Sequence, residues 1–282
     1  MAEAATLATV MAIFAALPLD HASALGGWIA RSIGPRLPLS RRALHNLARA
    51  MPENSTIENR RILAAMWDNL GRAMAEQPHL ARICAAASGR VEIVNRAAIT
   101  ELLASGRQVM FFGGHLANWE VGPSTIHQIM GDALLSVYRA ANNPWVDRLQ
   151  RRRLRSRRAV AKGAAGGRAL LRHLRRGGHV AMLVDQKQND GIAVPFFGMA
   201  AMTAPAVARL SRRFDCAILP VRVERLAGAH FRVTILPRLE TVDTGNADDD
   251  VLAAMTSVNA MIESWVRARP EQWTWLHHRW PT

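Results

Sequence analysis

The sequence predicts an α/β fold in which a mostly parallel central sheet is flanked by helices. From residue 90 onwards, short apolar runs that are typical of buried strands alternate with helical segments. Apolar residues make up 50% of the 282 residues, so the chain can form a substantial core. No internal repeat or low-complexity linker interrupts the alternation. Strands that alternate with helices of this length imply a parallel sheet covered on both faces.

Six strands are expected, each an apolar run bounded by turn residues: 90–94, 108–114, 133–139, 179–186, 216–225 and 230–239. Helices are expected between and after them, at 97–106, 118–131, 144–158, 166–178, 203–214 and 250–270. Upstream, residues 40–85 are expected to be helical. Ser55 and Glu58 form a capping box there, and one apolar helix face follows it: Ile62, Met66, Leu70 and Met74.

The first 35 residues form a segment of different character. Residues 4–19 carry no charge. This uncharged run is slightly short for a membrane-spanning helix, which needs about 20 residues. No basic region precedes this run, which argues against a secretory signal peptide. Four arginines follow it, and this favours a cytoplasmic location for what comes next: Arg31, Arg36, Arg41 and Arg42. We therefore expect residues 1–35 to be a membrane anchor that spans the membrane or lies in its interface, and residues 36–282 to be the catalytic domain. The alternative is a hydrophobic core helix.

The charge balance favours a polyanionic partner. The formal net charge is +14, and nearly all of the basic residues are arginines. Nucleic acid, anionic lipid headgroups and an acidic carrier protein all fit this charge. The densest basic stretch, residues 148–158, has only Trp145 nearby and no interleaved aromatic residues for base stacking. We therefore expect anionic membrane lipids or an acidic carrier, and no nucleic acid. A plain solvated helix face remains the alternative.

The two cysteines, Cys84 and Cys216, show no spacing that is typical of a metal site. We expect both to be small buried hydrophobic residues and expect no structural zinc. A reducing, cytosol-facing domain is consistent with this usage.

The stretch FFGGHLANWEVGP, residues 111–123, combines a strand end, a Gly–Gly turn, a histidine and a glutamate. Reactive groups of α/β sheets collect at the carboxyl ends of the strands, and His115 lies just past such an end. We expect Gly113 and Gly114 to form a loop there, because glycine adopts backbone angles that other residues avoid.

His115 and Glu120 are five residues apart, which would place them roughly 140° apart on a regular helix. They meet only if His115 lies in the loop and Glu120 in the first turns of the helix. Glu120 would then accept a hydrogen bond from Nδ1–H of His115 and leave Nε2 as a general base. No nucleophile motif accompanies the pair, so a bound hydroxyl is the expected nucleophile. The alternative is a loop histidine and an unrelated surface glutamate.

The segment GGHLANWE resembles the His-x-x-x-x-Asp/Glu motif of the glycerolipid acyltransferase superfamily. Further blocks resemble one branch, the lauroyl/myristoyl-type late acyltransferases of lipid A biosynthesis: RRALHNLARAMPE, YRAANNPWVDRLQRRRLR, LVDQKQNDGIAVPFFGMAAMTAPAVARLSRR, ILPVRVER and PEQWTWLHHRW. These blocks occur in the order of the family and cover most of the chain.

The resemblance implies roles for four residues. His115 would be the base and Glu120 its orienting partner. Arg139, at a strand end, matches a family arginine that assists at the site, where it would hold a lipid phosphate or stabilise the thioester oxyanion. Asp185 matches a family aspartate that supports the site. The implied reaction needs no metal and no organic cofactor.

The implied function is transfer of a fatty acyl chain from acyl-acyl carrier protein to a hydroxyl of a lipid A precursor of the Kdo-bearing lipid IVA type, in lipopolysaccharide biosynthesis. The implied location is the bacterial cell inner membrane, with the catalytic domain facing the cytoplasm. One alternative is an acyltransferase of the same fold that acts on another glycolipid, such as a phosphatidylinositol mannoside. The other is a non-catalytic protein that binds anionic membranes or nucleic acid through the basic stretch.

Overall fold

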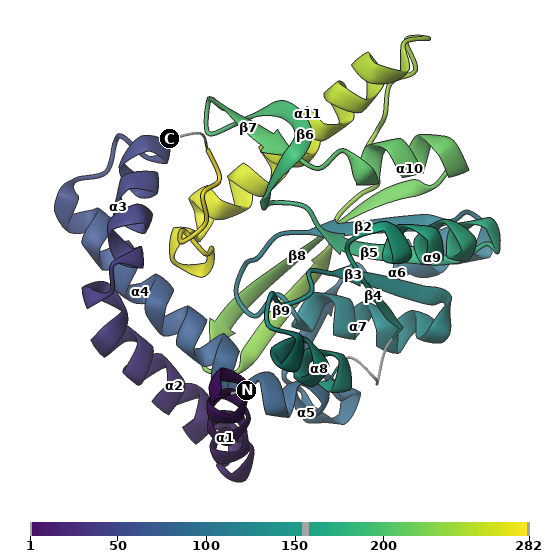
Figure 1. The fold of residues 1–282 in the computed structure, drawn as a ribbon. Coiled ribbons are helices and arrows are strands. Elements are labelled where there is room, and N and C mark those ends of the chain that lie inside the picture. Colours follow the sequence, from purple (N-terminus) through teal and green to yellow (C-terminus); the bar gives the residue numbers. More distant parts are fainter. Residues whose placement is uncertain (1, 154–157, 281–282) are drawn as a thin grey trace.

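The computed structural model of the chain describes residues 2–153 and 158–280. Within these residues, a seven-stranded sheet has the order β1-β9-β8-β2-β5-β3-β4 (Figure 1). Its neighbouring strands are parallel except for the antiparallel pair β8 and β9. Helices lie on both sides of the sheet. The predicted α/β fold with a mostly parallel sheet is therefore confirmed.

The strands of this sheet are β1 (Val91–Val94), β2 (Val109–Gly113), β3 (Leu134–Tyr138), β4 (Ala159–Ala161), β5 (His179–Leu183), β8 (Ala217–Ala227) and β9 (His230–Ile235). All six predicted strands are present, and β4 adds a short edge strand. A separate hairpin, β6 (Lys187–Phe196) and β7 (Met199–Thr203), was not predicted. The first four residues of β6 are all polar, so they lack the apolar alternation that indicates a half-buried strand.

The helices are α1 (Ala2–Ala16), α2 (Leu19–Ile33), α3 (Leu39–Ala50), α4 (Thr56–Ala75), α5 (Leu80–Cys84), α6 (Ala97–Ala104), α7 (Val121–Met130), α8 (Pro144–Arg153), α9 (Ala164–Arg175), α10 (Ala206–Phe214) and α11 (Ala247–Ala268). The predicted capping box is present at the start of α4, where the side chains of Ser55 and Glu58 each bond the other's backbone N–H. The predicted helix 144–158 begins as α8, and residues 154–157 lie outside the described residues.

Alternating side chains of the central strands feed two separate cores. In β2, Met110 and Phe112 face the core that contains α4, α9, α10 and α11, whereas Val109 and Phe111 face the core that contains α5, α6 and α7. All four side chains are at most 2% exposed. A strand that is buried on both faces reads as a continuous apolar run, which explains the sequence of this strand.

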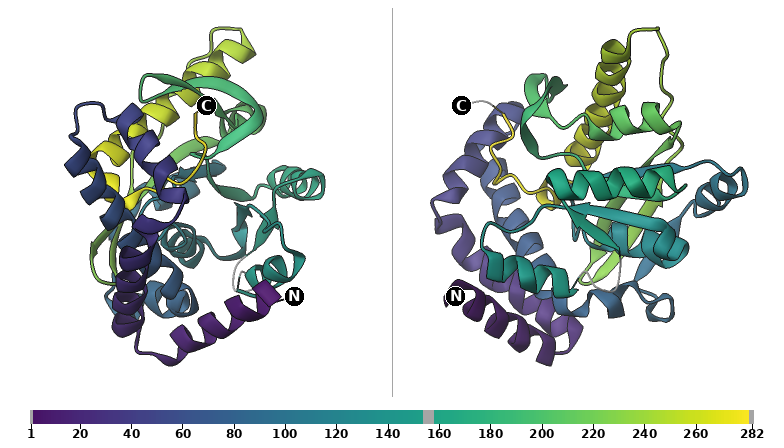
Figure 2. Two further views of the ribbon diagram at one scale, coloured as in Figure 1. Left: turned by 60° about the vertical axis from the view of Figure 1, so that its left-hand side comes forward. Right: turned by 45° about the vertical axis from the view of Figure 1, so that its right-hand side comes forward.

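The N-terminal region consists of α1 and α2, with Pro18 directly before α2. Among residues 2–153 and 158–280, none of the helices has both the length and the apolar character required to cross a membrane. Helix α2 runs beside α4 (Figure 2). The two backbones meet at Gly26 and Gly71, where a Cβ on Gly71 would lie 2.1 Å from the carbonyl oxygen of Gly26. Glycines are therefore needed on both helices for this close approach.

A buried ion pair ties these helices to the rest of the fold. Glu76, directly after α4, is fully buried and accepts two hydrogen bonds from the guanidinium of Arg225 in β8, at 2.5 and 3.0 Å. The same carboxylate accepts bonds from Ser23 of α2 at 2.7 Å and from Asn118 at 2.9 Å. Asn118 belongs to the loop between β2 and α7. One carboxylate thus joins α2, α4, β8 and this loop.

We expect Glu76→Gln to lower the free energy of unfolding by about 3–5 kcal/mol, because it leaves the Arg225 guanidinium buried without its counter-charge. The measurement is urea unfolding followed by circular dichroism. The matched control is Glu92→Gln, which breaks an exposed Glu92–Arg232 pair between β1 and β9 and should change stability little. Equal stability of the Glu76→Gln and Glu92→Gln proteins would contradict the structural role of the buried pair.

Candidate active site

Four neighbouring parallel strands each deliver one polar residue to the same edge of the sheet. His115 follows β2, Asp185 follows β5, Arg139 follows β3 and Lys162 follows β4. These strands are adjacent in the order β2-β5-β3-β4. Because carboxyl ends of parallel strands meet at one edge, the four side chains come from segments that are far apart in sequence but close in space. His115, Arg139 and Lys162 line one cavity.

The His115 imidazole is hydrogen-bonded to the Asp185 carboxylate. Nδ1 of His115 lies 2.7 Å from Oδ1 of Asp185, and the backbone N–H of His115 donates to Oδ2 at 2.8 Å. Trp273 donates its indole N–H to the same Oδ2 at 2.7 Å. The expected Nδ1 bond to Glu120 is therefore wrong, because Asp185 occupies that position. Nε2 of His115 lies 3.2 Å from the side-chain amide nitrogen of Gln186, which also lines the cavity.

Asp185 is only 2% exposed and keeps its charge. Burial alone would raise the pKa of this carboxyl, but the nearby imidazole and the hydrogen bonds from His115 and Trp273 outweigh it and hold the pKa well below its usual range. An ionised carboxylate on Nδ1 stabilises an imidazolium when Nε2 takes up a proton. The pair is thus arranged for general-base chemistry.

Glu120 is the residue directly before α7, and His115 lies in the preceding loop, as the spacing predicted. Glu120 lines the same cavity as His115. The structure therefore keeps Glu120 at the site but does not place it on the Nδ1 side of the histidine. Its catalytic role stays a prediction.

The loop that carries His115 is fixed by distant segments. Ala117 has a left-handed φ of 52° and is fully buried. Its N–H donates to the carbonyl of Gln272 at 2.8 Å, and its carbonyl accepts from Asn69 of α4 at 3.2 Å. An isolated antiparallel β-bridge also pairs Leu116, the residue before Ala117, with Trp273. These contacts hold a backbone conformation that a β-carbon disfavours.

The two glycines of the motif serve close packing and not unusual backbone angles. Neither Gly113 nor Gly114 is among the residues with positive φ. A Cβ on Gly114 would lie 2.7 Å from the Leu116 side chain and 3.4 Å from Asp185 Oδ2, and one on Gly113 would lie 3.0 Å from the Val221 carbonyl oxygen. The expectation that these glycines adopt angles closed to other residues is therefore wrong.

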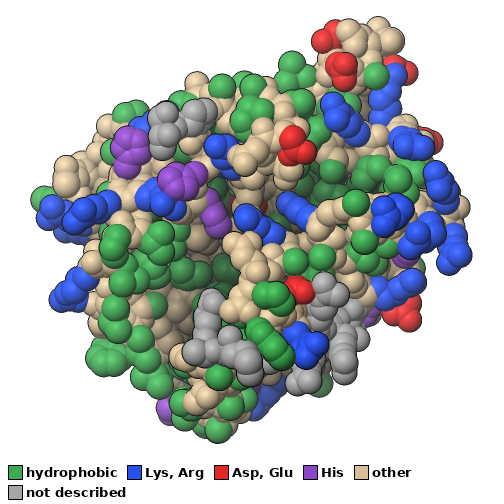
Figure 3. All heavy atoms as spheres, in the orientation of Figure 1, with side chains coloured by type: hydrophobic (Ala, Val, Ile, Leu, Met, Phe, Trp, Pro, Cys, Tyr) green, Lys and Arg blue, Asp and Glu red, His purple; other side chains and the backbone are tan. Residues whose placement is uncertain are grey.

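The cavity at this edge has a volume of about 400 Å³, which is in the range of small-molecule sites. Histidine and cationic side chains border a hollow in the middle of the face shown in Figure 3. Arg139 and Lys162 are the cations that line the cavity among the described residues. Partial desolvation lowers the pKa of Lys162, Asp185 opposes this and nearby Arg139 adds to it. Two cations on one wall favour an anionic group of a substrate.

Three residues of the site were not predicted: Lys162, Gln186 and His277. Gln186 lies between His115 and His277, with its amide nitrogen 3.2 Å from Nε2 of one and 3.1 Å from Nε2 of the other. Burial, followed by the proximity of His115, lowers the pKa of His277. A polar dipeptide after a buried strand marks Gln186 in the sequence, and the paired histidines near the C-terminus mark His277.

A second cavity of about 580 Å³ adjoins the first. The two share four wall residues: Val137, Lys162, Met182 and Leu183. Much of the remaining wall is apolar, including Leu170, Leu171 and Leu210. An apolar cavity beside a polar reactive site suits a substrate that has a reactive head and a hydrocarbon chain.

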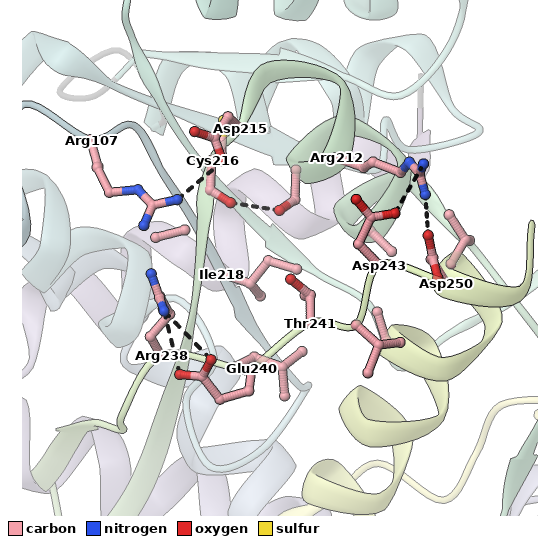
Figure 4. Close-up of a pocket in the computed structure, with 17 residues that line it drawn as sticks. Arg107, Arg212, Asp215, Cys216, Ile218, Arg238, Glu240, Thr241, Asp243 and Asp250 are labelled. Carbon is pink, nitrogen blue, oxygen red and sulfur yellow. Dashed lines mark hydrogen bonds and ion pairs between the residues drawn. The ribbon is translucent and has the colours of Figure 1, made fainter. Parts of the chain in front are cut away.

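The amino ends of β2 and β8 border another cavity, which Figure 4 shows. Its arginines are paired with carboxylates, as in the Arg107–Asp215 pair at 3.0 Å. Cys216 lies in its wall, and burial raises the pKa of its thiol to about 11, so it is an inert thiol. Cys84 and Cys216 are both free and buried, as predicted. Among the described residues, no group of three His, Cys, Asp or Glu side chains is arranged to hold a metal ion.

The basic stretch 148–158 is described only in part. Its backbone continues α8 to Arg153, and Arg148 stacks over the Trp145 ring at 5.2 Å. The side chains of Arg151, Arg152 and Arg153, and all of residues 154–157, lie outside the described residues. The predicted role of this stretch in binding lipids or a carrier therefore stays a prediction.

Comparison with known proteins places this geometry in a family. Residues 4–282 match the model of the bacterial lipid A biosynthesis acyltransferases. The chain is 29% identical over 243 residues to the lipid A biosynthesis myristoyltransferase of Escherichia coli K12, with 84% of this chain and 73% of the relative covered. It is 28% identical to the palmitoleoyltransferase of the same strain (85% and 78% covered) and 25% identical to its lauroyltransferase (84% and 77% covered). The chain belongs to the bacterial lipid A biosynthesis acyltransferase family.

Proposed function

We propose that this acyltransferase moves a fatty acyl chain from acyl-acyl carrier protein to a hydroxyl of a lipid A precursor of the Kdo-bearing lipid IVA type. The observation that carries the proposal is the hydrogen bond between the partly exposed His115 and the buried Asp185, beside a cavity lined by cations. That arrangement suits deprotonation of a hydroxyl beside an anionic group, and lipid A precursors carry both hydroxyls and phosphates. The E. coli relatives are named for transfer of acyl chains in lipid A biosynthesis.

In the proposed reaction, Nε2 of His115 takes the proton from the acceptor hydroxyl as its oxygen attacks the thioester carbonyl. Asp185 stabilises the imidazolium that forms. The tetrahedral intermediate then expels the carrier thiolate, which receives the proton from Nε2. General-base assistance of this kind contributes roughly a hundred- to ten-thousand-fold to a rate.

Arg139 and Lys162 provide the positive charge for this reaction. An arginine beside the reacting carbonyl stabilises the oxyanion or holds a phosphate of the acceptor, and in a partly dry cavity such a bond is strong. Glu120 lines the same cavity, and in this proposal its carboxylate would accept a hydrogen bond from a sugar hydroxyl of the acceptor. The adjoining apolar cavity of about 580 Å³ would take the acyl chain.

The test uses the purified protein, acyl-acyl carrier proteins of several chain lengths and Kdo-bearing lipid IVA in detergent. We expect mass spectrometry to show an acceptor that is heavier by one acyl group and release of free carrier thiol. A phosphatidylinositol mannoside acceptor serves as the comparison. Acylation of that glycolipid alone, or of neither, would refute the proposed acceptor.

We further propose that the protein works at the cytoplasmic face of the bacterial inner membrane. Exposed apolar side chains on α1, α2, the turn after them and the first residue of α3 form what we call the N-terminal apolar face: Val10, Ile13, Leu25, Trp28, Ile29, Ile33, Leu37 and Leu39. Trp28 is 58% exposed and Ile33 55%. The exposed Arg31, Arg36 and Arg41 lie among them. An apolar face bordered by arginines fits an anionic lipid interface.

We expect the double replacement of Trp28 and Ile33 by serine to weaken binding to phosphatidylglycerol vesicles by about tenfold or more, since each side chain contributes on the order of 1 kcal/mol when it leaves water. Co-sedimentation with the vesicles measures the effect. The control is Ile57→Ser, which removes an apolar side chain that is 65% exposed at the start of α4. Unchanged sedimentation of the double variant would place the membrane contact elsewhere.

A further inference from the structure

The side-chain amide of Gln186 lies between two imidazoles. Its nitrogen is 3.2 Å from Nε2 of His115 and 3.1 Å from Nε2 of His277. The two rings are 6.1 Å apart between centroids and nearly edge to face. A side-chain amide nitrogen carries two hydrogens, so it can donate one to each ring at the same time.

The direction of these bonds follows from Asp185. An ionised carboxylate only accepts, so His115 donates to it from Nδ1–H and keeps a lone pair on Nε2. Gln186 must therefore turn its NH2 group, and not its oxygen, toward His115. The second hydrogen of that group points to His277, which must also present a lone pair on Nε2. The result is a chain from Asp185 through His115 and Gln186 to His277.

His277 is held firmly in this place. Asn46 of α3 donates from its side-chain amide to the carbonyls of Trp275 and His277, both at 2.8 Å. Arg42 of the same helix donates to the carbonyl of Leu276 at 3.3 Å. The C-terminal segment is thus anchored on the helix packed beside it, and its imidazole forms a fixed acceptor for Gln186.

We propose that Gln186 is a positioning residue, which occupies the Nε2 lone pair of His115 until an acceptor hydroxyl replaces it, while His277 retains Gln186 by its other hydrogen. The inference rests on the proposed function, because it takes Nε2 of His115 as the base. The acceptor hydroxyl would displace one hydrogen bond and supply another, so the exchange costs little. Gln186 would stay on His277 during the reaction.

This exchange has a chemical consequence for the donor. An acyl thioester bound without an acceptor faces water as the competing nucleophile, and a free Nε2 would activate that water. A donor hydrogen bond on the lone pair makes the base unavailable until the proper hydroxyl arrives. Gln186 would therefore favour acyl transfer over hydrolysis.

The chain requires a neutral His277, since a protonated ring has no lone pair to offer. The charged or titratable groups that influence this ring are His115, Asp185, Arg139 and Arg42. Burial lowers the pKa of His277, the neighbouring His115 adds to this, and Asp185 opposes it. The His277 ring is therefore neutral at neutral pH, and its protonation in acid would break the hydrogen bond from Gln186.

The experiment measures thioester hydrolysis without acceptor and acyl transfer with acceptor, on the same enzyme preparations. We expect Gln186→Leu to raise hydrolysis about fivefold or more, the effect of one neutral hydrogen bond, and thus to lower the ratio of acyl transfer to hydrolysis. His277→Phe should also raise hydrolysis, because it removes the acceptor that retains the Gln186 amide. The matched control is His278→Phe, at an exposed neighbouring position, which should behave as the parent.

A second variant separates positioning from packing. Gln186→Glu puts a carboxylate beside Nε2, which favours a proton there, so the acid limb of the kcat/KM profile should move to higher pH by about one unit or more. A loss of local packing would not move that limb. Unchanged hydrolysis in Gln186→Leu together with an unmoved profile in Gln186→Glu would overturn the inference. A parent enzyme that transfers no acyl group would instead refute the proposed function and the inference with it.

Discussion

His115→Ala should lower acyl transfer by roughly a hundred- to ten-thousand-fold, the range over which a positioned general base accelerates a reaction. The variant keeps the cavity, the cations and the apolar chamber beside it, so substrate binding should persist. The loss should therefore appear in kcat and much less in KM. Transfer of radiolabelled acyl groups, measured with both substrates in excess, gives the comparison.

The matched control is His278→Ala, which removes an exposed imidazole from the C-terminal segment. Thermal unfolding of the His278→Ala variant should stay close to that of the parent, whereas His115→Ala should lower stability modestly, because the buried Asp185 carboxylate loses one of its hydrogen bonds and keeps those from the His115 backbone and Trp273. If the His115→Ala enzyme still turned over at a rate near the parent's, the base would have to be another group, and the mechanism proposed above would fail.

Local patterns predicted the strands of the sheet and the strand ends at which the site residues lie. The continuous apolar run of β2 and its Gly–Gly end placed His115 at the carboxyl edge, and the structure puts it in the loop before α7. The same reasoning placed Arg139 and Asp185 at strand ends. What local patterns lack is the order of strands across the sheet, and that order decides which strand ends are neighbours.

The partner of His115 shows this limit most clearly. Glu120 is close in sequence and was the natural candidate for the Nδ1 bond, whereas Asp185 lies 70 residues away. Asp185 reaches the histidine because β5 lies beside β2 in the sheet. Gln186 and His277, 91 residues apart, meet for a similar reason, since the chain returns to the site after α11. Periodicity carries no information about such encounters.

The β6–β7 hairpin and the motif glycines show two further limits. A strand with polar residues on both faces, as in the first half of β6, gives no alternating signal. The need for glycine at position 113 comes from the Val221 carbonyl oxygen, which the fold brings in from β8, and at position 114 from the Leu116 side chain, which the loop folds back. The one residue of the motif loop with positive φ is Ala117, and its conformation is fixed by Gln272 and Asn69.

Asp185→Asn should reduce turnover by about a hundredfold or more, because Asp185 is the group that fixes the tautomer of His115. Glu120→Gln should reduce turnover by a smaller factor. Oδ1 and Oδ2 of Asp185 both accept hydrogen bonds, from Nδ1 of His115 on one side and from the His115 backbone and Trp273 on the other. An asparagine places an NH2 group on one of these sides. That NH2 group then either faces two donors or forces the imidazole into the tautomer that has no lone pair on Nε2.

Turnover and thermal stability of both variants should be measured together, with Trp273→Phe as a control that removes one bond to Asp185 and leaves its charge. If Glu120→Gln were the more damaging change while Asp185→Asn kept most of the activity, the carboxylate that matters for the base would be Glu120, and the ground-state hydrogen bond between His115 and Asp185 would be a structural contact only.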